Sequence, residues 1–145
     1  MLPQAPEDAG YYVYGTLDNH PSHGASQYAH PALMTLILRV EREWRHLDMR
    51  KFGVGDISLV NGTDHPDHES HMTGLDVDVR PVRKDGQRIP VTWQQRDYDR
   101  DATAKLIELF MAFAPVKHLF FNDPSIPFAR QLPRHDNHFH ITLRG

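Results

Sequence analysis

The stretch DHPDHESHMTGLDVDVR, residues 64–80, decides the fold because it ends in a run of strictly alternating character. Apolar side chains at positions 75, 77 and 79 alternate with the carboxylates of Asp76 and Asp78. A period of two is typical of a β-strand, in which neighbouring side chains point to opposite faces. We therefore expect a strand over residues 75–79, with one apolar face for a core and one acidic face.

A second stretch with the same period, RHDNHFHITL, lies at residues 134–143. Its apolar positions 139, 141 and 143 share one face, and His138, His140 and Thr142 share the other. If the two strands pair, their polar faces coincide, and carboxylates and imidazoles come to the same side of one sheet. The apolar faces would then belong to a common core.

The paired strands predict a metal site. His71 stands just before the first strand, and Gly74 allows a tight bend between the two. We expect His71, Asp78 and His140 to surround one point, which gives two nitrogen donors, one oxygen donor and room for a water. Catalytic zinc sites are commonly built from three protein ligands and an open position. The alternation alone leaves open whether Asp76 or Asp78 is the oxygen ligand.

The rest of the chain predicts an α+β fold. Apolar residues at three- and four-residue spacing predict two helices, at residues 31–47 and, after a cap at Asp99 or Asp101, up to residue 114. Further short strands are expected at residues 56–60, 88–92 and 118–121, and an extended piece at 11–14 within a largely irregular arm, residues 1–30. We expect a small, mainly antiparallel sheet with the helices packed on its apolar face.

The length of 145 residues favours a single domain that spans residues 1–145. The net charge of −3 indicates neither nucleic acid nor an anionic membrane as a partner. No apolar run approaches the ~20 residues of a membrane span. The absence of cysteine excludes disulfides and thiolate metal sites. The beginning of the chain, MLPQAPEDAG, has no basic and then apolar pattern, so we expect no signal peptide.

The histidines have two alternative interpretations. They could form a surface cluster that binds metal without a function. His65 and Asp67 could belong to an iron(II) site, but they lie in a proline-bearing loop rather than in a strand. The sequence HESH at residues 68–71 is one residue short of the helical zinc motif HExxH, and Gly74 argues against a helix there.

Two motifs carry a specific resemblance, HESHMTGLDVD at residues 68–78 and HDNHFH at residues 135–140. They resemble the penicillin-insensitive murein endopeptidases. These belong to a wider group of zinc peptidases that includes lysostaphin-type enzymes, D-Ala-D-Ala peptidases and the hedgehog signalling domain. The resemblance covers mainly the two motifs, and it implies a hedgehog/D-Ala-D-Ala peptidase-like fold. The exported enzymes of the family carry a signal sequence and cysteines, whereas we find neither in this chain.

The resemblance implies that His71, Asp78 and His140 bind Zn²⁺ as the cofactor. It thereby selects Asp78 as the oxygen ligand, and we expect Asp76 to hydrogen-bond a ligand imidazole or a loop amide. Zinc would acidify a water so that a nearby histidine can take up a proton at neutral pH.

His138 is the first choice for this catalytic base, because the resemblance implies that it lies beside the metal, and His135 is the second. The resemblance also implies that His135 and His68 line the cleft, where His68 would contact substrate. Two residues outside the motifs are further candidate substrate contacts. Asn122 follows the strand predicted at residues 118–121, and Arg80 could bind a substrate carboxylate in bidentate fashion.

The resemblance thus implies a zinc-dependent peptidoglycan endopeptidase that hydrolyses cross-links involving D-alanine or a diamino acid. A chain without a leader fits a phage lysin or a secreted effector, made in the cytoplasm and acting on peptidoglycan in the periplasm or cell wall after release or secretion. We expect peptidoglycan stem peptides as the partner, no membrane insertion, and a monomer. The alternatives are a D-Ala-D-Ala carboxypeptidase or dipeptidase, and a zinc-bearing binding module without turnover.

Overall fold

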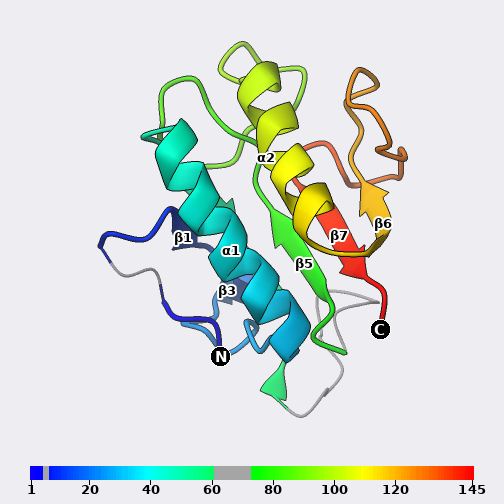
Figure 1. Ribbon diagram of the computed structural model, residues 1–145. Coiled ribbons are helices and arrows are strands. Elements are labelled where there is room, and N and C mark those ends of the chain that lie inside the picture. The colour runs from blue at the N-terminus through cyan, green and yellow to red at the C-terminus, as the bar shows by residue number, and fades with distance from the viewer. Residues whose placement is uncertain (5–6, 61–72) are drawn as a thin grey trace.

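The fold consists of two layers, with two helices packed on one face of a five-stranded sheet (Figure 1). The computed structural model describes residues 1–4, 7–60 and 73–145. Three histidines of the predicted metal loop, His65, His68 and His71, lie outside these residues.

Both helices form where the apolar spacing predicts them. Helix α1 (Pro31–Leu47) has the predicted bounds, and its apolar stripe is buried from Leu33 to Trp44. Helix α2 (Arg100–Phe113) begins after Asp99, whose carboxylate accepts a hydrogen bond from the Ala102 amide at 3.0 Å. This cap satisfies an amide that has no partner inside the helix. Neither helix, nor any other in the described ranges, is long and apolar enough to cross a bilayer.

The sheet has the strand order β1-β4-β5-β7-β6. The strands are β1 (Tyr11–Val13), β4 (Phe52–Val54), β5 (Asp76–Val79), β7 (Phe139–Leu143) and β6 (Val116–Phe120). All neighbours run antiparallel except β1 and β4, which are parallel. The predicted α+β class with a mainly antiparallel sheet is therefore confirmed.

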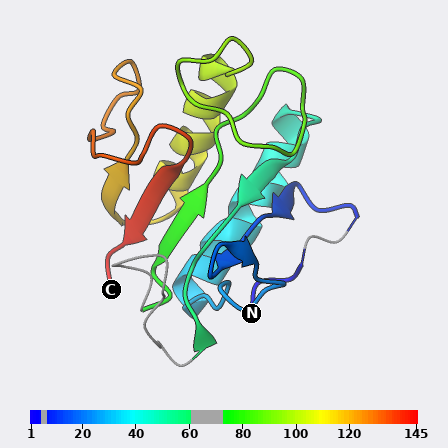
Figure 2. The same cartoon turned by 180° about the vertical axis from the view of Figure 1, so that it is seen from behind.

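The two stretches of alternating sequence pair directly. In the register of β5 and β7, Asp78 lies opposite His140 and Val77 lies opposite Ile141. The apolar side chains Val77 and Ile141 are fully buried in the core beneath the helices. The alternation then turns the acidic and histidine side chains to the other face, which the helices leave uncovered (Figure 2).

Two predicted strands are wrong. The strand expected at 56–60 lies earlier, as β4, and residues 56–58 are held by other bonds. The Asp56 carboxylate accepts hydrogen bonds from the Thr16 amide and the Ser26 hydroxyl, and the Ile57 amide donates to the Ser26 carbonyl. The hairpin partner expected at residues 88–92 forms no strand.

The amino-terminal arm is more regular than predicted. Besides β1, it contains the short antiparallel pair β2 (Thr16–Leu17) and β3 (His20–Pro21). The bonds from Thr16 to Asp56, at 2.6 Å from the amide and 3.0 Å from the hydroxyl, hold this pair against the sheet. Residues of the arm therefore contribute one wall of the cleft described below.

Candidate active site

The centre of the site is a buried pair formed by Asp78 on β5 and His140 on β7. The Nδ1 atom of His140 lies 2.9 Å from Asp78 Oδ1, and its Nε2 atom lies 2.9 Å from Asp76 Oδ1. Thr142 donates its hydroxyl to the same oxygen of Asp76. Asp76 thus accepts a hydrogen bond from the imidazole of His140, the predicted ligand, and Asp76 and Thr142 together fix the orientation of the His140 ring.

This environment favours a protonated His140. Burial lowers its pKa, but the hydrogen bonds to Asp76 and Asp78 outweigh burial and raise the pKa to about 9. Without a metal, the ring therefore carries two protons at neutral pH and donates to both carboxylates. A metal that binds His140 through Nδ1, the nitrogen that faces Asp78, has to displace the proton on that nitrogen.

The donor set fits a divalent metal such as zinc. Two atoms bound to one zinc at about 2.0–2.1 Å in a tetrahedron lie about 3.3 Å apart. The 2.9 Å between His140 Nδ1 and Asp78 Oδ1 has to widen only slightly to admit the ion. Asp76 on the opposite ring nitrogen is the usual support for a metal-binding histidine. Among the described residues no complete group of three ligands converges, and the predicted third ligand, His71, lies outside them.

The two candidate catalytic histidines lie next to this pair. His138 Nε2 is 3.7 Å from Asp78 Oδ1. The rings of His135 and His138 are 4.8 Å apart between centroids, and His135 is 6.0 Å from His140. Phe120 of β6 contacts both His135 and His140, at 5.7 and 6.1 Å between ring centroids, and forms a wall beside them. The described part of the chain thus brings three of the predicted histidines together.

A hydrogen-bonded loop carries His135 and His138 to this position. The Asp136 carboxylate accepts hydrogen bonds from Trp93 Nε1 at 3.1 Å and from Asn122 Nδ2 at 2.8 Å. The Asn122 side-chain oxygen accepts from the Leu132 amide, and its backbone amide donates to the His135 carbonyl. The Asn122 side chain therefore holds the loop. The roles of Trp93 and Asp136 could not be predicted from the sequence, because no local pattern links residues so far apart in the chain.

An open cleft of about 290 Å³ adjoins the site. It is lined by Asp78 and His138 from the site, by Arg80, Pro90 and Asn137, by Asp56, and by Tyr14, Thr16 and Asn19 from the arm. Arg80 is thus a cleft residue, as its predicted role requires, whereas Asn122 is not among the residues that line this cleft. Tyr14 was missed, because a single tyrosine in an irregular segment gives no signal of its own.

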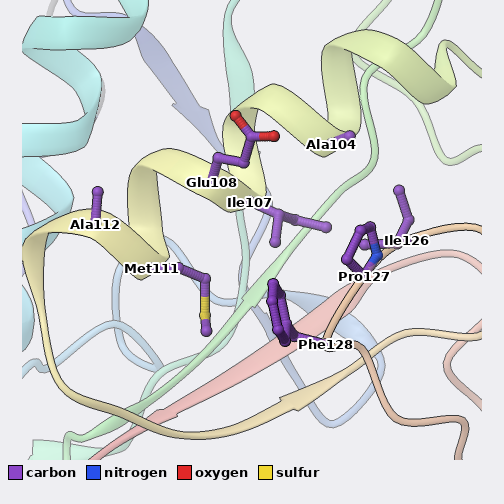
Figure 3. A pocket seen from close by; sticks show the side chains of 8 residues that line it. All are labelled: Ala104, Ile107, Glu108, Met111, Ala112, Ile126, Pro127 and Phe128. Atoms are coloured by element: carbon purple, nitrogen blue, oxygen red, sulfur yellow. The ribbon is translucent and has the colours of Figure 1, made fainter.

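A second hollow, of about 280 Å³, lies between α2 and the segment that follows β6 (Figure 3). The side chains around it are mostly apolar, including Ile107, Met111 and the exposed Phe128. Among the described residues that line it, Glu108 is the only one with an ionisable side chain. This hollow lacks the groups that hydrolysis requires, so the cleft beside Asp78 is the candidate active site.

The comparison with known families agrees with this geometry. The family model for penicillin-insensitive murein endopeptidases matches residues 20–109, more than half of the chain. The match includes β5 with Asp76 and Asp78 and ends before β7, so the contribution of His138 and His140 rests on the pairing of the strands. No curated protein matches the chain significantly. The chain belongs to the family of penicillin-insensitive murein endopeptidases.

Proposed function

We propose that this protein is a zinc-dependent murein endopeptidase that hydrolyses peptide cross-links involving D-alanine or a diamino acid. The observation that carries the proposal is the buried Asp78–His140 pair, with His138 at 3.7 Å, at the edge of an open cleft. Family membership supports action on murein. The imidazole nitrogen and the carboxylate oxygen support zinc, because zinc accepts both types of ligand.

In this proposal His71, Asp78 and His140 hold the metal. When bound, zinc supplies Lewis acidity for the scissile carbonyl and acidifies a water. His138 takes up the proton of the attacking water and returns it to the leaving amine, with His135 as the second candidate for the same task. Asp76 keeps the His140 ring in place throughout, because it is hydrogen-bonded to the ring nitrogen that faces away from Asp78.

The cleft would hold the peptidoglycan stem peptides. Arg80 lines the cleft and is the candidate for contact with a substrate carboxylate. His68 is a further candidate for contact with the substrate. Asn122 acts through the loop that carries His135, and we assign it a positioning role. We propose that a monomer acts on the cell wall after release or secretion, as a phage lysin or a secreted effector.

Digestion of purified sacculi, followed by chromatography of the products, tests the proposal. Loss of cross-linked dimers is expected for the wild type. Release of D-alanine alone would instead indicate a carboxypeptidase, and binding of sacculi without any cleavage would indicate a binding module. Treatment with a chelator should abolish cleavage, and addition of Zn²⁺ should restore it.

Three variants separate the roles of the histidines. His140→Ala should lose the metal, measured by elemental analysis, and with it all cleavage. His138→Ala should keep the metal and lose cleavage by at least about 100-fold. His46→Ala, at an exposed position in the last turn of α1, is the matched control and should behave as the wild type. Full cleavage by His138→Ala would show that this histidine is not the catalytic base.

A further inference from the structure

The cleft contains an arginine whose charge is not neutralised by any partner in the described part of the chain. Arg80 makes one long hydrogen bond there, from Nη1 to the Arg88 carbonyl at 3.4 Å, and no ion pair. A guanidinium has five N–H donors, so most of those on Arg80 remain available. The cleft also contains two carboxylates. Asp56 accepts hydrogen bonds from Thr16 and Ser26, and Asp78 lies 3.7 Å from His138 at the candidate metal site.

The guanidinium is held in a defined place. Its Cζ atom lies 3.9 Å from the centroid of the Tyr14 ring, within the range of a cation–π contact. The ring of Tyr14 in turn packs against Gly55, where any side chain would collide with it. The Tyr14 hydroxyl is shielded from solvent and has no hydrogen-bond partner among the described residues. The cleft therefore presents a positioned cation next to an unsatisfied donor.

The position of Arg80 relative to Asp78 limits what the cation can contact. Arg80 continues β5 beyond its last residue, since its amide donates to the Gly53 carbonyl at 3.0 Å. It lies two residues after Asp78, so both side chains share one face of the sheet, and their Cα atoms are about 7 Å apart. A substrate carbonyl that reacts beside Asp78 therefore has its immediate neighbours within reach of the guanidinium.

Among the α-carboxylates of a peptide substrate, only that of the leaving residue can lie so near. The carboxyl of the acyl-side residue is the scissile carbonyl itself. A free α-carboxylate on the leaving residue is three covalent bonds from that carbonyl carbon. We infer that Arg80 selects substrates whose leaving residue carries a free α-carboxylate, by bidentate hydrogen bonding from a guanidinium held on Tyr14. This inference rests on the proposed function and names the substrate class of the same site.

The test compares two soluble cross-linked stem-peptide dimers that differ only at the leaving residue, with a free α-carboxylate or the corresponding carboxamide. The wild type should prefer the acid by about 10- to 100-fold in kcat/KM, the usual range for a hydrogen-bonded charge. Arg80→Gln should reduce the preference to near one, and Arg80→Lys should retain part of it. Because the readout is a ratio for one protein preparation, partial misfolding of a variant does not affect it.

Arg88→Gln is the matched control, because Arg88 lies over the neighbouring Tyr12 ring and does not line the cleft. It should keep the preference of the wild type. Equal cleavage of acid and amide by the wild type, or an unchanged preference in Arg80→Gln, would overturn the inference and leave the proposed function intact.

If the wild type cleaves neither dimer, a binding measurement still tests the role of Arg80 separately from the proposed function. In that case the proposed function fails, and calorimetry with the same two dimers still tests Arg80. Preferential binding of the acid that disappears in Arg80→Gln would support the carboxylate site. Equal affinities for acid and amide would overturn it.

Discussion

Gly55→Ala should disturb both the stability of the protein and its cleft. A Cβ atom at this position would lie 2.5 Å from Cζ and 2.8 Å from the hydroxyl of Tyr14. An ordinary carbon–carbon contact is about 3.5–4.0 Å, so the ring has to move by about 1 Å. The backbone of Gly55 cannot yield easily, because its amide donates to the Asp78 backbone carbonyl and its carbonyl accepts from the Gln27 side-chain amide.

Overpacking of this kind costs about 1–3 kcal/mol of unfolding free energy. For 145 residues the unfolding entropy is about 0.3 kcal/mol per degree, so the midpoint of thermal unfolding should fall by about 3–10 °C. The displaced ring also no longer supports Arg80, so the preference for acid over amide substrates should decrease. Thermal unfolding followed by circular dichroism and the paired-dimer assay measure the two effects separately.

Gly53→Ala provides the control for this experiment. Its Cβ would lie 2.7 Å from the Tyr12 ring, a similar collision with a ring that does not line the cleft. The Tyr12 centroid is 5.9 Å from the Arg80 Cζ atom, against 3.9 Å for Tyr14, so Tyr12 supports Arg80 less closely. Gly53→Ala should therefore lower the unfolding midpoint and change the substrate preference much less than Gly55→Ala does. In the double variant Gly55→Ala/Tyr14→Leu the collision is gone, so the stability losses should not add. A Gly55→Ala protein with the wild-type midpoint would refute this account of the packing.

Three further outcomes are expected elsewhere in the molecule. Asp136→Ala removes the acceptor for Asn122 and loosens the loop that carries His135 and His138. Cleavage of sacculi should fall by about 100-fold, because a displacement of a catalytic group by about 1 Å has an effect of this size. An unchanged rate would contradict the positioning role of Asn122. Arg50→Met breaks the contacts to Asp48 at 2.6 Å and Asp99 at 2.9 Å that join the end of α1 to the start of α2. It should lower the unfolding free energy in urea by about 2 kcal/mol. The hydrogen bond from Arg50 also lowers the pKa of Asp48, so its contribution is complete above the unfolded pKa of about 3.9 and is lost as the pH falls through the folded pKa. Acid titration of stability should therefore be shallower for Arg50→Met, and parallel curves would argue against this linkage.

The parts of the fold that the sequence predicts are those with a strong local period. The alternation around Asp76 and Asp78 identifies β5 and its polar face, and that around His140 identifies β7. The apolar spacing of α1 reproduces its bounds at both ends. Because each pattern fixes which side chains share a face, the meeting of Asp78 and His140 could also be predicted once the two strands were paired.

The features that escaped prediction depend on contacts between distant segments. Strand β4 has three residues with Gly53 at its centre, and glycine weakens a strand pattern. The position of Tyr14 under Arg80 joins the amino-terminal arm to the end of β5. Asn122 has the local pattern of a turn residue, and only the folded loop reveals its bond to Asp136. None of these partners is encoded by spacing along the chain.

The placement of β7 between β5 and β6 has a consequence for how the protein acquires activity during synthesis. Both neighbouring strands leave the ribosome before β7 does, yet neither has its central partner until β7 inserts between them. The same strand delivers the imidazole that completes the buried pair with Asp78. An unfinished chain therefore lacks the Asp78–His140 pair, on which the proposed hydrolysis depends, until β7 has paired with β5.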